Sequence, residues 1–442
     1  MPDENAGEGL KRVIGVPGLT LSIINGVIGA GIFALPAIVS VAIGSFAIIS
    51  YLVCGLLFAA ILLCYAEIGS KITSSGGSYT YVEKALGEFP GYIINWMYFF
   101  GWSLLSCAAL MNLLADSLAV IYPIFLQALP RALLFFVLVL FIILVNVYGA
   151  RQSVIAVKIV TVAKLLPLLG IIVLGIQLIN TDNLRLKSIP SFKTFSDTTL
   201  ILFFAFSGFE TSLGASGEIK NPRRTVPLSI GIGGLVILGI YLLIQIVTQG
   251  ILGGDMEKYQ SAPLAAVADK IIGPAGATIL LICAAVSCFG NVMMDVFCTP
   301  RALFAGANDG LFPKILGSVH PKFATPHVAV LIYGGLIFLL SISGGFQQLA
   351  IMASANILLI YLAVVISTIK LRNNKLSTKE EGFKAPGGMI TPLVAIGVIV
   401  WLLTGLKKWE ILSTLIFILA VVLIYFLSKQ LGRKKLNPEQ NS

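Results

Sequence analysis

The feature that most constrains this chain is its series of long apolar stretches. Each comes close to the roughly 20 apolar residues that a helix needs to cross a bilayer. The stretches cover approximately residues 17–40, 45–69, 89–119, 131–149, 153–179, 197–215, 227–252, 271–305, 326–343, 347–369, 390–406 and 410–428. The sequence therefore predicts an all-α integral membrane protein with 12 transmembrane helices, one for each stretch.

The composition supports the same fold class. Apolar residues make up 57% of the chain, charged residues make up 11%, and the mean hydropathy is +0.96. Soluble proteins are about 45–50% apolar and about 25% charged, so a soluble enzyme, a nucleic-acid-binding domain and a disordered protein are excluded. The cysteines all lie in apolar stretches without a CxxC pair, and the two histidines share one polar loop. We therefore expect no disulfide framework, no metal site and no cofactor.

The lysines and arginines are distributed unevenly between the two sides of the predicted bundle. Of the 30, 21 fall on the side of the N-terminus, 8 fall on the other side, and Lys164 lies within a span. Because cytoplasmic loops carry an excess of basic residues, we expect a cell-membrane protein with both termini in the cytoplasm. The net charge of +10 then belongs to these loops and does not indicate a nucleic acid partner.

Two spans, the first and the sixth, are interrupted by small and polar residues. The first contains three glycines, Gly26, Gly29 and Gly31, and the sixth contains Ser207, Gly208 and Glu210 within its sequence FSGFE. Glycine inside a helix costs about 1 kcal/mol relative to alanine. Matching breaks in two halves of a membrane transporter point to a binding site near the bilayer midplane. The alternatives are close helix packing through small residues and a nucleotide-binding glycine loop, whose G-x-G-x-x-G order is missing.

Four motifs occur in order along the chain. They are GAGIF at 29–33 with Leu35-Pro36, Glu67 with SGGSYTY at 75–81, FSGFE at 206–210 with GEIKNPRRTVP at 217–227, and Arg301 with NDGLFP at 308–313. Together they resemble the amino acid–polyamine–organocation (APC) superfamily of transporters. The resemblance implies a LeuT-like fold, a 5+5 inverted repeat in which helices 1 and 6 are unwound mid-membrane.

The implied organisation divides the chain into four parts. A cytoplasmic tail (1–16) precedes a transporter core at 17–369, two further helices at 390–428 and a cytoplasmic tail at 429–442. Within the core, the two repeats cover about 17–179 and 197–369.

The resemblance also implies how the two breaks bind an α-amino acid. Backbone N–H groups of Ala30 and Gly31 are expected to bind its carboxylate, because helix N-termini favour anions. Carbonyl groups freed by unwinding are expected to bind its ammonium group. The residues that supply these carbonyls are Val27, Phe204, Ala205 and Ser207. Phe206 is expected to close the pocket as an aromatic gate, and Gly29 belongs to the same substrate-binding set.

Two ionisable residues are expected at membrane depth, where charges are costly and are functional candidates. By the resemblance, Lys164 takes the place of the sodium ion of sodium-coupled relatives, near Gly29, which implies sodium-independent transport. Glu210 is implied to act in proton sensing or gating. The alternatives are that Lys164 reaches water at the membrane interface and that Glu210 caps a half-helix.

The eighth span carries a polar stripe with a spacing of four residues, and its members are Ser287, Asn291, Asp295 and Thr299. By its place in the resemblance, Asp295 lines the side-chain pocket together with Asn291, and an acid there favours a cationic side chain or an amine. Alternatively, Asp295 forms a structural ion pair with a basic residue, namely Lys158, Lys164 or Arg301.

Two further acids, Glu67 and Glu218, are placed at cytoplasmic helix ends. We expect them to pair with basic residues of the neighbouring loops, such as Arg223 and Arg224.

These expectations predict a secondary active amino acid transporter that works by alternating access, as a sodium-independent exchanger or proton-coupled symporter with cationic amino acids as candidate substrates. The alternative is a polyamine or amine antiporter of the same fold. A channel would leave the helix breaks unexplained, and an intramembrane enzyme would need a nucleophile–base pair or metal ligands at one depth, which the spans lack. The expected partners are a small-molecule amino acid and the lipid bilayer, and the oligomeric state is unknown from sequence.

Overall fold

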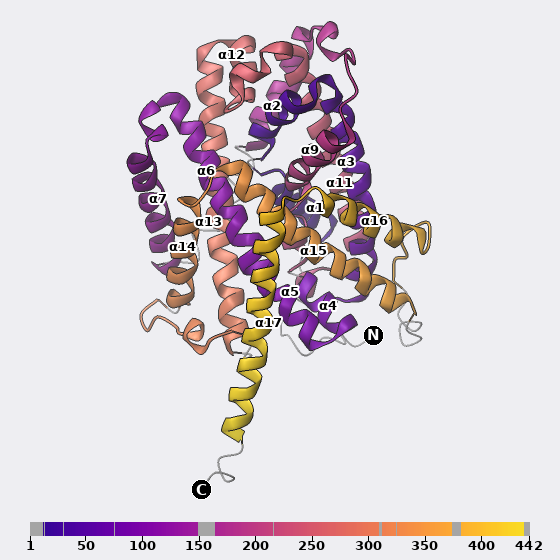
Figure 1. The fold of residues 1–442 in the computed structure, drawn as a ribbon, viewed down its shortest axis with the longest axis vertical. Coiled ribbons are helices and arrows are strands. Elements are labelled where there is room, and N and C mark those ends of the chain that lie inside the picture. The colour runs from indigo at the N-terminus through magenta and orange to yellow at the C-terminus, as the bar shows by residue number, and fades with distance from the viewer. Residues whose placement is uncertain are drawn as a thin grey trace.

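The chain folds into a bundle of helices (Figure 1). The computed structural model describes residues 12, 14–29, 31–74, 76–148, 164–214, 216–308, 312–323, 325–373 and 382–436. Within these ranges there is no β-strand, and one isolated bridge joins Ile14 to Ile219. The expected all-α class therefore agrees with the described part of the chain.

The α-helices follow one another along the chain. They are α1 (Val16–Val27), α2 (Gly31–Ile43), α3 (Ala47–Lys71), α4 (Ser78–Leu86), α5 (Glu88–Trp96), α6 (Leu104–Ile121), α7 (Ala128–Tyr148), α9 (Phe192–Phe206), α10 (Glu210–Leu213), α11 (Pro222–Leu252), α12 (Pro263–Ile272), α13 (Pro274–Asn308), α14 (His327–Ser341), α15 (Phe346–Asn373), α16 (Ile390–Thr404) and α17 (Lys408–Leu436). A further apolar helix covers Lys164–Leu178. A π-helical segment, η2 (Met97–Ser103), joins α5 to α6.

Several helix ends carry the residues that sequence rules prefer there. Proline stands in the first turn of α1, α11 and α12, as Pro17, Pro222 and Pro263, where its missing N–H costs nothing. The Ser191 side chain caps α9 by accepting a hydrogen bond from the N–H of Thr194. Of these helices, α1 and α9 carry residues of the site described below.

The helices pack in two groups. In the first group α11 packs against α3 and α1, and α9 packs against α2 and α3. In the second group α13 packs against α6, and α14 packs against α7 and α6 (Figure 1). Helix α15 contacts members of both groups, since it packs against α3 and α9 as well as α6. The site lies where the first and second groups face each other.

An aromatic cluster fills the core of the first group and joins it to α15. Phe58 and Tyr65 of α3 contact Phe209 edge-on, with ring centroids 5.5 and 4.9 Å apart, and Tyr65 contacts Tyr361 of α15 at 5.4 Å. Aromatic pairs in this geometry add about 0.5–1.5 kcal/mol each beyond the burial of their area. The cluster therefore stabilises the position of α9 and α10 against α3 and α15.

Many helices are long and apolar enough for a membrane. In the described ranges, 7 helical segments could cross a bilayer by length and composition, and one of them, Gly31–Lys71, includes both α2 and α3. Shorter apolar helices cover Val16–Val27, Lys164–Leu178, His327–Ser341 and Ile390–Thr404. The chain is thus a multi-pass membrane protein, and the number of 12 spans with its inverted repeat stays a prediction.

Candidate functional site

The first helix is interrupted between α1 and α2. α1 ends at Val27 and α2 begins at Gly31, and Ile28 and Gly29 between them are not helical. The N–H of Gly29 turns back to the Val27 carbonyl at 2.7 Å, which ends the helical hydrogen-bond pattern. The first N–H groups of α2 have no acceptor within their own helix, and such an end favours an anion. The role predicted for Ala30 falls on a residue outside the described ranges.

A second interruption separates α9 from α10. α9 ends at Phe206, Ser207 is extended, and Gly208 has φ +112°, a conformation that favours glycine. The N–H of Gly208 donates to Oε2 of Glu210 at 3.0 Å, and the hydroxyl of Tyr361 donates to the same oxygen at 2.6 Å. Glu210 is buried, so its carboxylate supplies an internal acceptor to the amide that the break leaves free.

The two interruptions meet backbone to backbone at two glycines. A Cβ atom added to Gly26 would lie 2.8 Å from the carbonyl oxygen of Gly208. A Cβ atom added to Gly208 would lie 2.6 Å from the carbonyl oxygen of Gly26. Neither distance leaves room for a side chain, so the close approach of the two broken helices depends on both glycines.

A cavity of about 140 Å³ opens beside this meeting point. Most of the predicted substrate residues line it, namely Val27, Gly29, Gly31, Phe204, Ala205, Ser207, Asn291 and Asp295. A space of this volume is much larger than one water molecule requires. The cavity therefore brings together the broken ends of α1, α2 and α9 and the polar face of α13.

Phe206 is not among the lining residues of this cavity. Its ring packs against Tyr241 at 5.1 Å and against Phe58 at 5.8 Å, and its side chain is buried. It lines a separate, small apolar pocket between α1, α3 and α11. In this conformation Phe206 belongs to the aromatic core, because the ring at the end of α9 points to the side away from α13.

Asp295 lies on the cavity wall and is held by side chains of four helical segments. The Ser103 hydroxyl contacts both carboxylate oxygens at 2.7–2.8 Å, and the Tyr333 hydroxyl donates to Oδ2 at 2.7 Å. Cys107 and Thr299 donate to the same carboxylate at 3.1 and 3.2 Å. These neutral donors come from η2, α6, α13 and α14, and they orient the carboxylate without neutralising its charge.

The ion pair considered for Asp295 does not form within the described part of the chain. No salt bridge to Asp295 is found there. Arg301 instead donates to the carbonyl of Phe297 and lies over its ring, 3.8 Å from the centroid. Lys164 has a different partner, and Lys158 lies outside the described ranges. The carboxyl group of Asp295 therefore faces the cavity without a cationic partner among the described residues.

Lys164 lies next to the end of α1 and does not line the cavity. Its side chain is 1% exposed, and Nζ donates to the carbonyl of Asn25 at 2.9 Å. The alternative in which Lys164 reaches interfacial water is wrong for this conformation, since the side chain is buried. Lys164 supplies a donor to a carbonyl near the first interruption, two residues before α1 ends.

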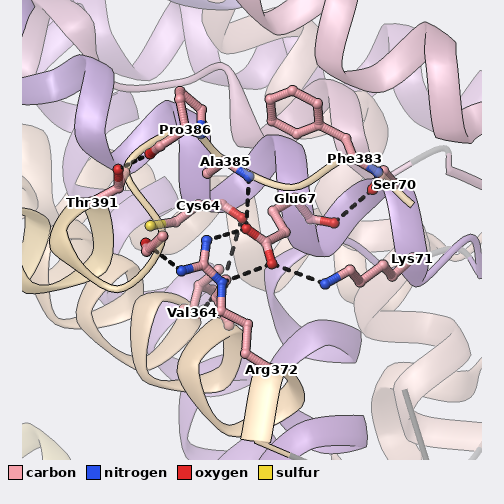
Figure 2. Close-up of polar contacts among 12 residues, drawn as sticks. Cys64, Glu67, Ser70, Lys71, Val364, Arg372, Phe383, Ala385, Pro386 and Thr391 are labelled. Carbon is pink, nitrogen blue, oxygen red and sulfur yellow. Dashed lines mark hydrogen bonds and ion pairs between the residues drawn. The ribbon is translucent and has the colours of Figure 1, made fainter. Parts of the chain in front are cut away.

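Glu67 has partners that differ from the expected ones. Its carboxylate accepts hydrogen bonds from Nζ of Lys71 at 2.9 Å, from the Arg372 guanidinium and from the N–H of Ala385 at 2.9 Å (Figure 2). The expectation of pairing with residues such as Arg223 and Arg224 was wrong for Glu67. The reason lies in the tertiary structure, because the last turn of α15 packs beside the end of α3 and places Arg372 next to Glu67.

Sequence reasoning missed several side chains of the site. Ser103 and Cys107 hold Asp295, Tyr333 completes that network, and Trp102 also lines the cavity. Ser103 and Cys107 are spaced by four, and this pattern could have indicated a polar stripe facing Asp295. Trp102 and Ser103 lie in η2, and π-helical turns are frequent at functional sites but have no sequence signature here.

Comparisons with known proteins agree over nearly the whole chain. The sequence model of a family described as amino acid permease matches residues 14–432. The chain is 29% identical over 435 residues to the branched-chain amino acid permease BcaP of Bacillus subtilis (strain 168), which covers 95% of this chain and 93% of that protein. It is 27% identical to the methylthioribose transporter of the same organism, over 96% of this chain and 95% of that one. It is also 27% identical to the serine/threonine exchanger SteT, over 88% and 89%.

Proposed function

Because the chain belongs to the amino acid permease family, we propose that it carries an α-amino acid across the membrane by alternating access, with the cavity between the two interruptions as its substrate site. The family consists of transporters, so the enzyme alternative is dropped. Alternating access means that the cavity opens to one side of the membrane at a time. The localisation in the cell membrane, with both termini in the cytoplasm, is part of the same proposal.

One observation carries this proposal: helix ends of opposite polarity line one cavity. The N-terminal end of α2 at Gly31 offers N–H groups to a carboxylate, and the C-terminal end of α9 at Ala205 offers carbonyl groups to an ammonium. Every free α-amino acid carries both a carboxylate and an ammonium group on its α-carbon. The cavity wall formed by α13 would then face the substrate's side chain.

The substrate class follows from Asp295. A carboxylate on the cavity wall without a cationic partner among the described residues attracts a positive charge, and the transported molecule can supply it. We propose amino acids with a cationic side chain, with Asn291 one helical turn away on the same face. The alternative substrate is a polyamine or amine, which would use Asp295 but not the N–H groups of α2.

Coupling is proposed from the two buried charged groups. Lys164 provides a fixed donor near the first interruption, so transport is expected to need no sodium. Glu210 at the second interruption is the candidate for proton sensing or gating, in a symporter or an exchanger.

The experiment is uptake of labelled arginine by liposomes that contain the purified chain. Unlabelled lysine, leucine, serine, the diamine putrescine and methylthioribose are added as competitors, and replacement of sodium by choline is tested in parallel. We expect saturable uptake that arginine and lysine inhibit most, that putrescine inhibits less, and that is unchanged without sodium. Strongest inhibition by leucine would contradict the cationic substrate class, and strongest inhibition by putrescine would favour the amine carrier.

Asp295→Asn in the same assay separates the side-chain pocket from the rest of the site. The amide retains the shape of the network but removes the charge, so inhibition by arginine should weaken about tenfold while inhibition by leucine changes less than about twofold. Equal changes for both competitors would make Asp295 a structural residue.

A further inference from the structure

The segment between α13 and α14 holds both histidines of the chain. It contains a short helix, η8 (Lys314–Gly317), and then residues 318–323 and 325–327, which we call the histidine loop. The half-buried ring of His320 lies 5.2 Å from the ring of His327, at an angle of 85°. Neither ring lines the cavity, so the proposed transport mechanism leaves both histidines without a role.

His320 closes the histidine loop through its side chain. Its Nδ1 atom accepts hydrogen bonds from the N–H of Lys322 at 3.2 Å and from the N–H of Phe323 at 3.3 Å. Its own backbone N–H donates to the carbonyl of Thr325 at 2.8 Å. A ring nitrogen of histidine can accept only while it carries no proton. The closed loop therefore requires His320 with an unprotonated Nδ1.

The closed loop is attached to the end of α7. The hydroxyl of Thr325 donates to the carbonyl of Val147 at 2.9 Å. The ring of Phe323 meets the ring of Tyr148 edge-on, with centroids 4.7 Å apart. Both contacts come from residues that the hydrogen bonds of His320 hold in place, so the attachment to α7 depends on the closed form of the loop.

The loop also connects to the wall of the cavity through α14. The N–H of His327, the first residue of α14, donates to the carbonyl of Thr325 at 2.8 Å, the same carbonyl that the N–H of His320 uses. Further along α14, the Tyr333 hydroxyl donates to the carboxyl group of Asp295. The loop therefore fixes the start of the helix that holds Asp295.

The titratable groups around His320 are all potential cations or neutral rings. His327 lies at the start of α14, Tyr148 at the end of α7, and Lys322 has its Nζ atom 5.6 Å from the centre of the Phe323 ring. Lys314 lies in η8, which packs against α13 and α14. No ion pair between either histidine and a carboxylate is found among the described residues. Protonation of both rings at this spacing is opposed by charge repulsion.

We infer that His320 is a pH switch which closes the histidine loop while its Nδ1 is unprotonated and opens the loop when Nδ1 takes up a proton. Histidine gains its charge between about pH 8 and pH 5. A protonated Nδ1 is a donor, so the N–H groups of Lys322 and Phe323 lose their acceptor. The loop then separates from α7 and releases the start of α14. The consequence for the side-chain pocket at Asp295 rests on the proposed function.

The test is hydrogen exchange of the purified chain in detergent, measured by mass spectrometry on peptides that cover residues 318–328. Exchange is compared at about pH 7.5 and about pH 5.5, and each rate is divided by the intrinsic rate of an unprotected amide at that pH. Protection in the wild-type chain should fall about tenfold at the lower pH, because the loop opens. Equal protection at the two pH values would overturn the switch.

Three variants separate the acceptor from the ring. His320→Asn supplies an oxygen that can accept from the same two N–H groups and does not titrate, so its loop should stay protected at both pH values. His320→Phe keeps a ring but removes the acceptor, so its loop should exchange fast at both. His327→Gln is the control, because Nδ1 of His327 has no partner in the described part of the chain, and it should respond to pH as wild type does. Wild-type protection in His320→Phe would overturn the role of Nδ1.

Arginine uptake by reconstituted protein tests the connection to the cavity. On acidification, the KM of the wild-type chain should rise about threefold more than the KM of His320→Asn, because only the wild-type loop opens. Equal rises in KM would overturn the effect on the side-chain pocket. Absence of uptake at every pH would overturn the proposed function, whereas the exchange measurement would still decide the role of His320.

Discussion

Each of the two interruptions leaves backbone groups without their helical hydrogen-bond partners, and the two interruptions differ in the side chains that replace these partners. At the first, carbonyl groups at the end of α1 receive donors from distant helices, from Lys164 to Asn25 and from Tyr241 to Val27. At the second, the amide of Gly208 receives an acceptor from Glu210, two residues further along the same segment. The Tyr241 hydroxyl also donates to the Ala205 carbonyl, so side-chain donors satisfy carbonyls at both interruptions, whereas a side-chain acceptor for a free amide is found at the second. The groups remaining for a ligand are N–H groups at the first and carbonyls at the second, which matches the two charges of an amino acid.

The largest effect is expected where the two interruptions touch. Gly208→Ala places a Cβ atom 2.6 Å from a backbone oxygen, at a residue whose φ of +112° already disfavours any side chain. The interruptions must separate, so uptake should fall about a hundredfold or more, equivalent to about 3 kcal/mol. The measurement is uptake by reconstituted protein. Gly239→Ala is the control, since a Cβ atom there meets nothing within 4 Å and uptake should be unchanged. Normal uptake by Gly208→Ala would show that the contact is dispensable.

An intermediate effect is expected at the second interruption. Glu210→Gln keeps an oxygen that can accept from Gly208 and Tyr361, but it removes the only acid in this contact. Uptake should fall about tenfold, and its dependence on pH between about 5 and 8 should flatten, because a titrating group has been replaced by an amide. Glu218→Gln, close in sequence but outside the site, serves as control. A pH profile that keeps its wild-type shape would remove Glu210 from coupling.

The smallest effect of the three is expected at the first interruption. Lys164→Met retains the apolar stem but removes the donor to Asn25, while Tyr241 still holds the end of α1. The loss of one buried hydrogen bond corresponds to roughly 1 kcal/mol, so uptake should fall about fivefold. Uptake is measured with sodium and with choline. If uptake by Lys164→Met comes to depend on sodium, a sodium ion has replaced the lysine at the first interruption. That result would support the comparison of the two interruptions. Wild-type uptake without sodium dependence would contradict it.

The positions of the interruptions could be predicted from sequence because their causes are local. Glycine at 26, 29, 31 and 208 weakens helical segments that are otherwise apolar, and the structure interrupts the helices after Val27 and after Phe206. The polar face of α13 that lines the cavity could be predicted as well, because a spacing of four residues determines which side chains share a helix face.

The missed residues depend on contacts between distant segments. Tyr333 reaches Asp295 across 38 positions, and Arg372 reaches Glu67 across 305. No periodicity in one helix specifies which neighbour packs against it. The direction of the Phe206 ring was equally hidden, because it depends on the position of Phe58 in α3.

The cluster at Glu67 restricts how the bundle can move. The buried carboxylate joins the last turn of α3 to Arg372 of α15 and to the segment at Ala385 that leads into α16 (Figure 2). Pulling these three segments apart would break the ion pair with Arg372 and the hydrogen bond from Ala385, and would leave the buried carboxylate with Lys71 of α3 as its remaining partner among them. The helices can separate more easily by tilting about this end. α3 has 25 residues, or about 37 Å of length, so a tilt of about 5° would displace its far end by about 3 Å.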